Sequence, residues 1–112
     1  MAISYPEVRV EQIATADTTQ YTVSSGTTAE VTQGTITNES ASNETFSIYI
    51  PNPTAAGGDT NVLIDTKAIL AGKTDLLPEL IGKRLTAGSV IKTTCSTANA
   101  LNMHLSLMVR TN

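Results

Sequence analysis

The chain has 112 residues, which suits a single domain over residues 1–112, and 40% of them are hydrophobic, enough to build a core. Only 15% are charged, and the net charge of −3 argues against a protein that binds nucleic acid through its phosphates. A single cysteine excludes a disulfide within the chain, and no run of about 18 apolar residues predicts a membrane span. The first residues lack the apolar stretch of a secretory signal, so we expect folding in a cytoplasm.

Residues 1–10 predict an extended arm. Pro6 has no backbone N–H and disfavours helix at Tyr5. Val8 and Val10 then alternate with charged residues, which indicates a weak strand. Because an extended segment can add a strand to a neighbour's sheet, we expect this arm to contact a partner.

Short strands follow the arm, separated by turn residues. Residues 21–23 predict one strand, and the alternation restarts at residue 29 but changes parity near Gly34, which predicts a β-bulge or a bend. Phe46 and Ile48 continue the alternation until Pro51 ends that strand.

The second half repeats this pattern after a long loop at residues 54–60. Pro78 and Gly82 bracket a segment that predicts one helical turn, with proline at its first position and glycine after its end. Apolar runs predict strands at residues 62–64, 67–70, 75–77 and 89–95.

The last strand, over residues 101–110, carries the clearest signal. Its apolar residues occupy every second position, which places them on one face of a pleated strand, whereas a helix would spread them around its circumference. This face, which we expect to pack into the core, comprises Leu101, Met103, Leu105, Leu107 and Val109.

Together these segments predict an all-β fold. Roughly eight or nine short strands, each followed by a turn after about 8–12 residues, are typical of an antiparallel β-sandwich or a barrel. We favour a jelly-roll-like β-sandwich with an extended N-terminal arm, and an immunoglobulin-like topology is the alternative.

Residue types that carry chemistry are scarce. His104 is the sole histidine, on the polar face of the last strand, and no motif supplies a nucleophile for it, so we expect neither an enzyme nor a bound cofactor. One histidine is also too few for a metal site of the cupin kind, and Asp59 with Asn61 offers too few ligands for Ca²⁺. Cys95 adjoins an apolar strand and is interpreted as a buried structural thiol.

Two other features suggest binding or modification. Asn38 and Asn43 each begin a match to the N-glycosylation sequence, which we interpret as chance in a chain so rich in serine and threonine. Sugar-binding sandwiches stack sugar rings on exposed aromatic residues. Tyr49 is the one candidate, because it lies between Ile48 and Ile50 and faces away from the core.

Several segments resemble small virion proteins of tailed bacteriophages. The first is Thr35-Ile-Thr-Asn-Glu-Ser40 followed by Thr45-Phe-Ser-Ile-Tyr-Ile50, and the more specific one is Leu77-Pro-Glu-Leu-Ile-Gly82 followed by Ala87-Gly88. The similarity spans about residues 19–110 and therefore leaves out the arm. It implies a virion structural protein with a β-sandwich fold, located on the head, the neck or the tail.

The first functional hypothesis is a capsid decoration, or cement, protein that binds the outside of the head and contacts the major capsid protein. We expect a homo-oligomer, with a trimer favoured, that is part of the virion, assembles in the host cytoplasm and contacts neither nucleic acid nor membrane. The alternatives are a tail or neck adaptor or baseplate protein, and a small carbohydrate-binding adhesion module. The predicted interface residues are Ile3, Tyr5, Val8, Val10 and Tyr49.

Overall fold

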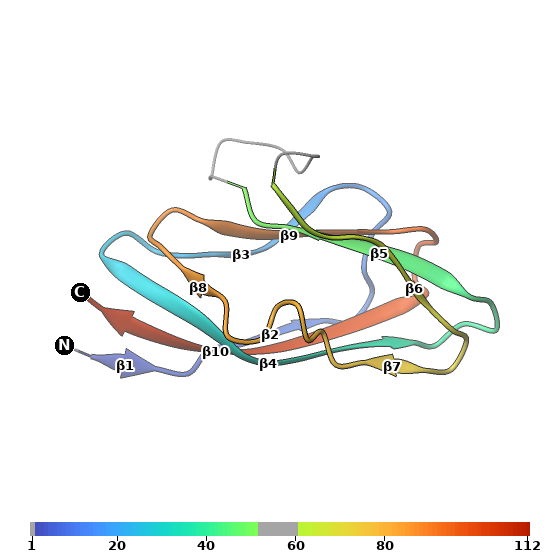
Figure 1. Cartoon of the computed structure of the whole chain (residues 1–112), viewed down its shortest axis with the longest axis horizontal. Coiled ribbons are helices and arrows are strands. Elements are labelled where there is room, and N and C mark those ends of the chain that lie inside the picture. The colour runs from blue at the N-terminus through green and yellow to red at the C-terminus, as the bar shows by residue number, and fades with distance from the viewer. Residues whose placement is uncertain (1, 52–60) are drawn as a thin grey trace.

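The computed structural model describes residues 2–51 and 61–112, and within them every regular element is a strand. Figure 1 shows two sheets stacked face to face. The strands are β1 (Ile3–Ser4), β2 (Glu7–Val10), β3 (Thr18–Thr22), β4 (Thr27–Asn38), β5 (Glu44–Tyr49), β6 (Val62–Ile69), β7 (Thr74–Asp75), β8 (Arg84–Leu85), β9 (Val90–Cys95) and β10 (Leu101–Thr111).

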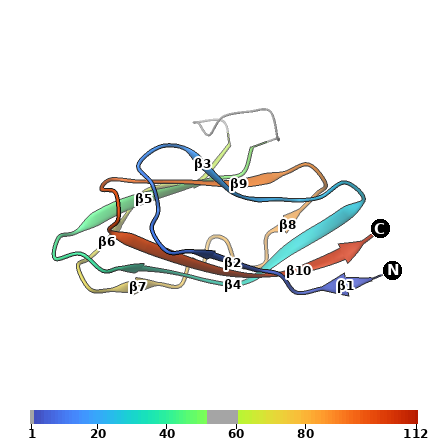
Figure 2. The same cartoon turned by 180° about the vertical axis from the view of Figure 1, so that it is seen from behind.

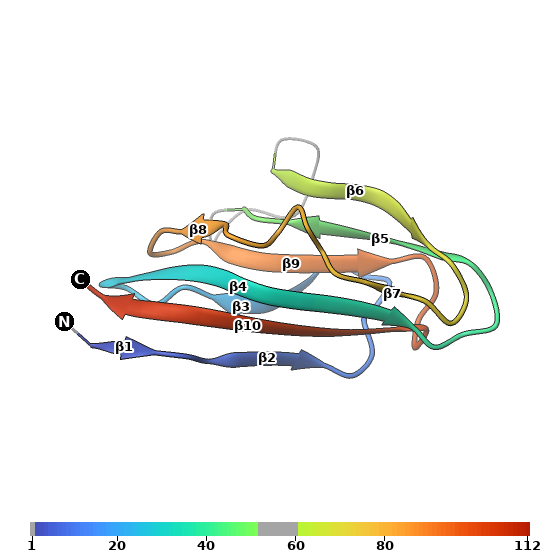
Figure 3. The ribbon, with the colours of Figure 1, turned by 60° about the horizontal axis from the view of Figure 1, so that its bottom comes forward.

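The strand order is that of a jelly roll. In the six-stranded sheet, β1 and β2 pair with one side of β10, whose other side pairs with β4, and β4 then pairs with β7 and β8. The four-stranded sheet has the order β3-β9-β5-β6. Figure 2 shows β3 and β9 over β2 and β10 from behind, and Figure 3 shows the order within the sheets.

Two interrupted strands explain why one sheet has six strands and the other four. If β1 with β2 and β7 with β8 are each taken as one broken strand, each sheet has four strands. The first strand then pairs with the last, the second with the seventh, the third with the sixth and the fourth with the fifth, all antiparallel. This winding confirms the predicted jelly-roll sandwich and differs from the immunoglobulin order.

The core lies between the sheets, and the facing predicted for the last strand is confirmed. Leu101, Met103, Leu105 and Leu107 are each at most 1% exposed, whereas His104 between them is exposed. The one-sided burial sets the register of β10, because a shift by one residue would turn its apolar residues to the solvent.

The predicted bulge in β4 is also present. Gln33 pairs with Ser106 and Val31 with Leu107, so Thr32 is the inserted residue. The bulge therefore lies two residues before Gly34, and the parity change that it causes lets Val31 and Ile36 both reach the core.

The predicted turn after Pro78 forms without extending into a helix. The N–H groups of Leu80 and Ile81 both donate to the carbonyl of Leu77, at 3.0 and 3.3 Å, and Gly82 follows with a φ of 83°. Leu77 and Leu80 are fully buried, so this turn closes one side of the sandwich. Among the described residues no helix has the length and hydropathy needed to cross a membrane.

Candidate functional site

The residues that the sequence offers as candidates for catalysis or metal binding do not form a common site among the described residues. The His104 Nε2 atom lies 3.3 Å from a carboxylate oxygen of Glu7, which also forms an ion pair of 2.8 Å with Arg9. Within residues 2–51 and 61–112 no three metal-ligating side chains come together. Asp59 and the rest of the loop at residues 54–60 lie outside the described residues, whereas Asn61 is described.

Cys95 is buried, as the sequence predicted. Its thiol donates to the carbonyl oxygens of Ile13 and Thr97, both at 3.2 Å. Burial raises the pKa of the Cys95 thiol, and the charge of Glu44 adds to the increase against the lowering effect of the Thr97 hydrogen bond. The thiol therefore stays protonated, which suits a packing role rather than a nucleophile.

Asn38 has a structural role that the sequence did not reveal. The side chain is fully buried, and its amide nitrogen donates to the carbonyl oxygens of Ser42 and Ile69, at 2.8 and 3.1 Å. Its amide oxygen accepts from the backbone N–H and the hydroxyl of Ser40. A side chain enclosed in this way holds the β4–β5 turn and cannot present its nitrogen to a glycosylating enzyme.

The arm is extended, but it lies on the chain's own sheet. Ile3 pairs with Arg110 and Val8 with Leu105, which makes the arm the edge strand beside β10. Because β10 offers a long free edge and an apolar face, Val8 packs into this chain's own core, where it is 8% exposed. The expected role of Val8 as an interface residue stays a prediction, since this exposure is that of a single copy.

The other predicted interface residues differ in exposure. Tyr5 and Ile3 are 75% and 48% exposed, so both remain accessible beside β10. Val10 is half-buried and packs against the core. Tyr49 is half-buried on β5, where it pairs with Val62 and Lys92.

The structure reveals an apolar hollow on the outer face of the six-stranded sheet. Leu76 is 68% exposed and Ile81 40% exposed, and both come from the segment that connects β7 to β8. They stand over the bulged part of β4, which contributes uncharged residues only. The hollow measures about 400 Å³ and is lined by Thr32, Gln33, Gly34, Thr35, Leu76 and Ile81.

A second, polar hollow of about 280 Å³ lies beside it on the same face. Thr35 lines both hollows, so they adjoin along β4. Arg9, Glu39 and His104 give the polar hollow charged or titratable walls. The side-chain oxygen of Asn102 in this hollow is buried without a hydrogen-bond partner among the described residues.

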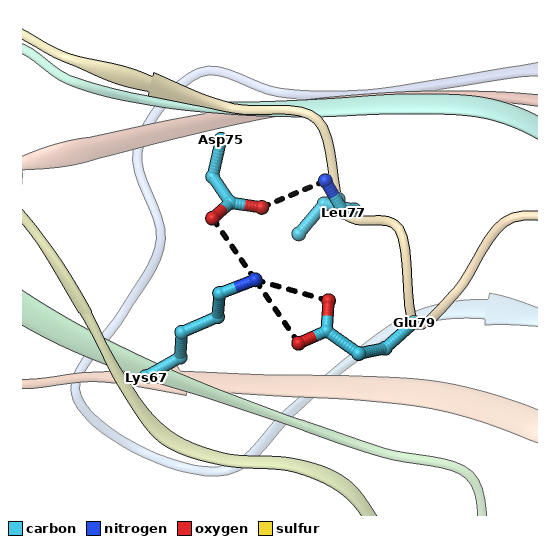
Figure 4. Close-up of polar contacts among 4 residues, drawn as sticks. All are labelled: Lys67, Asp75, Leu77 and Glu79. Carbon is cyan, nitrogen blue, oxygen red and sulfur yellow. Dashed lines mark hydrogen bonds and ion pairs between the residues drawn. The ribbon is translucent and has the colours of Figure 1, made fainter.

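An ionic clip positions the segment that carries Leu76 and Ile81 (Figure 4). The Lys67 ammonium on β6 lies 3.0 Å from Glu79 and 3.1 Å from Asp75, so it joins the two sheets across their open side. Asp75 also accepts a hydrogen bond of 2.7 Å from the N–H of Leu77, whose φ is 51°. This contact supports a backbone conformation that a leucine seldom adopts.

The surroundings of Lys67 favour its charged form. Burial lowers the pKa of Lys67, but the hydrogen bonds to Glu79 and Asp75 and their negative charges raise it by more. The net pKa lies above its usual value, so the ion pairs are complete at neutral pH. Sequence reasoning missed this arrangement, because nothing in the spacing of residues 67, 75 and 79 predicts that they meet.

Comparison with known proteins gives a likeness of fold. No family model matches the chain, and no curated protein matches it. Among solved structures it is similar to a chain in the crystal structure of the T13 IBDV viral particle, with a TM-score of 0.55 and 10% sequence identity. The alignment covers 96% of this chain and 30% of that chain, so this protein spans about a third of its structural neighbour.

Proposed function

We propose that this protein is a structural component of a virion, and specifically a bacteriophage decoration protein that binds the outside of the head. The observation that carries the proposal is the exposed apolar hollow at Leu76 and Ile81, all of whose lining residues are uncharged. A surface of this kind loses little hydration free energy when it is covered by another protein.

The fold supports the same proposal. The jelly roll occurs in viral capsid proteins, and the similar chain described above belongs to a viral particle. The sequence segments that resemble phage virion proteins lie within the part of the chain that forms the two sheets. A jelly roll also serves many other functions, so the surface and not the fold carries the argument.

The mechanism we propose is stabilisation by mass action. A protein that binds only the assembled shell stabilises that shell in proportion to its occupancy and affinity. The apolar hollow would receive an apolar side chain of the major capsid protein, and the protein would transform no substrate. Joining copies on the shell multiplies weak contacts through effective concentration, and the trimer expected from the sequence is one such arrangement.

The test compares two sets of surface variants in a pelleting assay with shells that lack this protein. The double variant Leu76→Ser with Ile81→Ser should lose binding, because it removes the apolar walls of the hollow. Leu70→Ser is the matched control, since Leu70 is 55% exposed but lies outside the hollow. Equal binding by the double variant and the wild type would contradict the proposal.

A copy number separates a position on the head from one at the neck or tail. Decoration of the head requires many copies distributed over the shell, whereas an adaptor or a baseplate protein is confined to one vertex or to the tail. Cryo-electron microscopy of particles with and without the protein measures both quantities. Density for this protein at the tail alone would replace the head position by the adaptor hypothesis.

A further inference from the structure

The strand at the free edge beside β10 is longer and more regular than its two labelled pieces suggest. The pairs Ile3–Arg110 and Val10–Met103 belong to one unbroken register. The N–H of Thr111 donates to the carbonyl of Ala2, and the N–H of Leu107 to that of Pro6. Residues 2–10 thus keep one register along this edge without a bulge, and Figure 3 shows β1 and β2 end to end as the outermost strands of their sheet.

The same hydrogen bonds show which backbone groups face outward. In an antiparallel pair, alternate residues direct both their N–H and their C=O to the same neighbour. The bond from Leu107 to Pro6 places the even-numbered residues on the β10 side. Glu7 and Arg9 therefore present their N–H and C=O groups to the open side, and the missing N–H of Pro6 leaves the outward series intact.

The other sheet edges in the described part of the chain are interrupted. β3 is bulged between Thr19 and Tyr21, and β6 carries two register shifts against β5. On the opposite side of the six-stranded sheet, β7 and β8 have two residues each. Bulges and short strands of this kind prevent pairing with another chain, so the edge at residues 2–10 is the one left suitable for it.

We propose that a second copy of this chain adds to this edge, with the two edge strands antiparallel and Val8 opposite Val8 of the second copy. Glu7 then lies opposite Arg9 of the second copy, and Arg9 opposite its Glu7. Two cross-strand ion pairs thereby replace or extend the Glu7–Arg9 pair of 2.8 Å within each copy. In this register the outward-facing N–H and C=O groups of Glu7 form hydrogen bonds with those of Arg9 of the second copy, and those of Arg9 with those of its Glu7. The two Val8 side chains meet on the core side as a pair without hydrogen bonds, where side chains approach most closely.

Charge selects this register over its neighbours. Centring the pair on Glu7 or on Arg9 would place two identical charges opposite each other, which destabilises a strand pair. A shift by one residue would place Glu7 opposite Val8, so that the core face of one copy would lie on the same side as the outer face of the other. The resulting unit is a dimer with a continuous sheet through both copies, in place of the trimer expected from the sequence, and it goes beyond the proposed function because it requires no shell.

The first experiment measures the dimer dissociation constant of the full chain by sedimentation equilibrium. Arg9→Glu and Glu7→Arg should each weaken the dimer by about tenfold, because both symmetric ion pairs become repulsive. The exchange Glu7→Arg with Arg9→Glu restores opposite charges and should return the constant to near the wild-type value. Wild-type protein that stays monomeric at all concentrations would overturn the inference, as would a double exchange no tighter than the single variants.

The second experiment separates the edge from any other contact. Amide hydrogen exchange followed by NMR should show Glu7 and Arg9 exchanging rapidly in dilute protein and becoming protected as the concentration rises. Val8 and Val10, whose N–H groups face β10, should be protected at both concentrations. Arg9→Pro removes an outward N–H while leaving the β10 ladder intact, so it should abolish the dimer and keep the thermal unfolding midpoint. Protection of Glu7 and Arg9 on adding shells but never on self-association would show that the occupant is the shell and would contradict the inference.

Discussion

A Cβ atom on Gly34 would lie 2.8 Å from Cδ2 of Leu105, the residue opposite it on β10. The same atom would lie 3.2 Å from Cδ1 of Leu77. Because Gly34 has no side chain, two fully buried leucines fit beside it, Leu105 from β10 and Leu77 from the segment before β8. Gly34 is a packing residue as well as a neighbour of the bulge.

Gly34→Ala should therefore destabilise the fold by about 1–3 kcal/mol, because the added methyl group forces buried side chains away from their positions. Urea unfolding of the wild type and the variant measures this difference. Adding Leu105→Val to Gly34→Ala should recover part of the loss, since the shorter side chain relieves the overlap. Additive losses in the double variant would show that the two residues do not interfere.

Leu105→Asp should prevent soluble folding. The leucine is fully buried, and an unpaired carboxylate in the core costs several kcal/mol. His104→Asp is the control, because residue 104 is exposed and pairs with Arg9 across the strands. Circular dichroism of the soluble fractions compares the two, and folded Leu105→Asp would show that this face of β10 is not the core face.

Asn38→Ala should destabilise the protein by about 1–3 kcal/mol, because the carbonyls of Ser42 and Ile69 lose their donor. Asn43→Ala makes a suitable comparison, since the Asn43 side chain accepts one exposed hydrogen bond from Ala71. Thermal unfolding should show the larger decrease for Asn38→Ala. Equal midpoints for the two variants would contradict the role assigned to Asn38.

Lys67→Met should lower stability at neutral pH by about 1 kcal/mol and free the segment that carries Leu76. Because the pKa of Lys67 is higher in the folded protein than its ordinary value of 10.5, its stabilising contribution is complete below that pH. It is lost as the pH rises through the folded pKa. The difference between wild type and variant, measured by urea unfolding, should shrink above pH 10.5 and not between pH 6 and 9.

Cys95 should react slowly with iodoacetamide in the folded protein. Burial raises its pKa and encloses its sulfur, so both the thiolate fraction and its access are low. Denatured protein should react at the rate of a free cysteine at the same pH. Mass spectrometry follows the modification, and rapid labelling of folded protein would show that the thiol is accessible.

The apolar hollow depends on contacts between segments that are distant in the sequence. The sequence predicts a strand at Leu76 and a helical turn at Ile81, whereas the exposure of both side chains follows from the position at which Lys67 holds Glu79. Lys67 belongs to β6, whereas Glu79 lies in the segment between β7 and β8, and no local pattern specifies that the two segments meet. Asn38 likewise matched a modification motif in the sequence, whereas its burial arises from the turn that closes around it.

The all-β class and the core face of β10 follow from the sequence alone, because alternating apolar residues share one face of a pleated strand and a shift by one residue would expose that face. The change of parity in the apolar positions also predicts a bulge or a bend in β4, and the structure has a bulge there. That Thr32 is the inserted residue, and that the arm at residues 2–10 pairs with the chain's own sheet, is known from the strand pairing in the structure. Both depend on which strand pairs with which. Every residue except proline has the same backbone donor and acceptor, so the residues of a strand do not specify its partner.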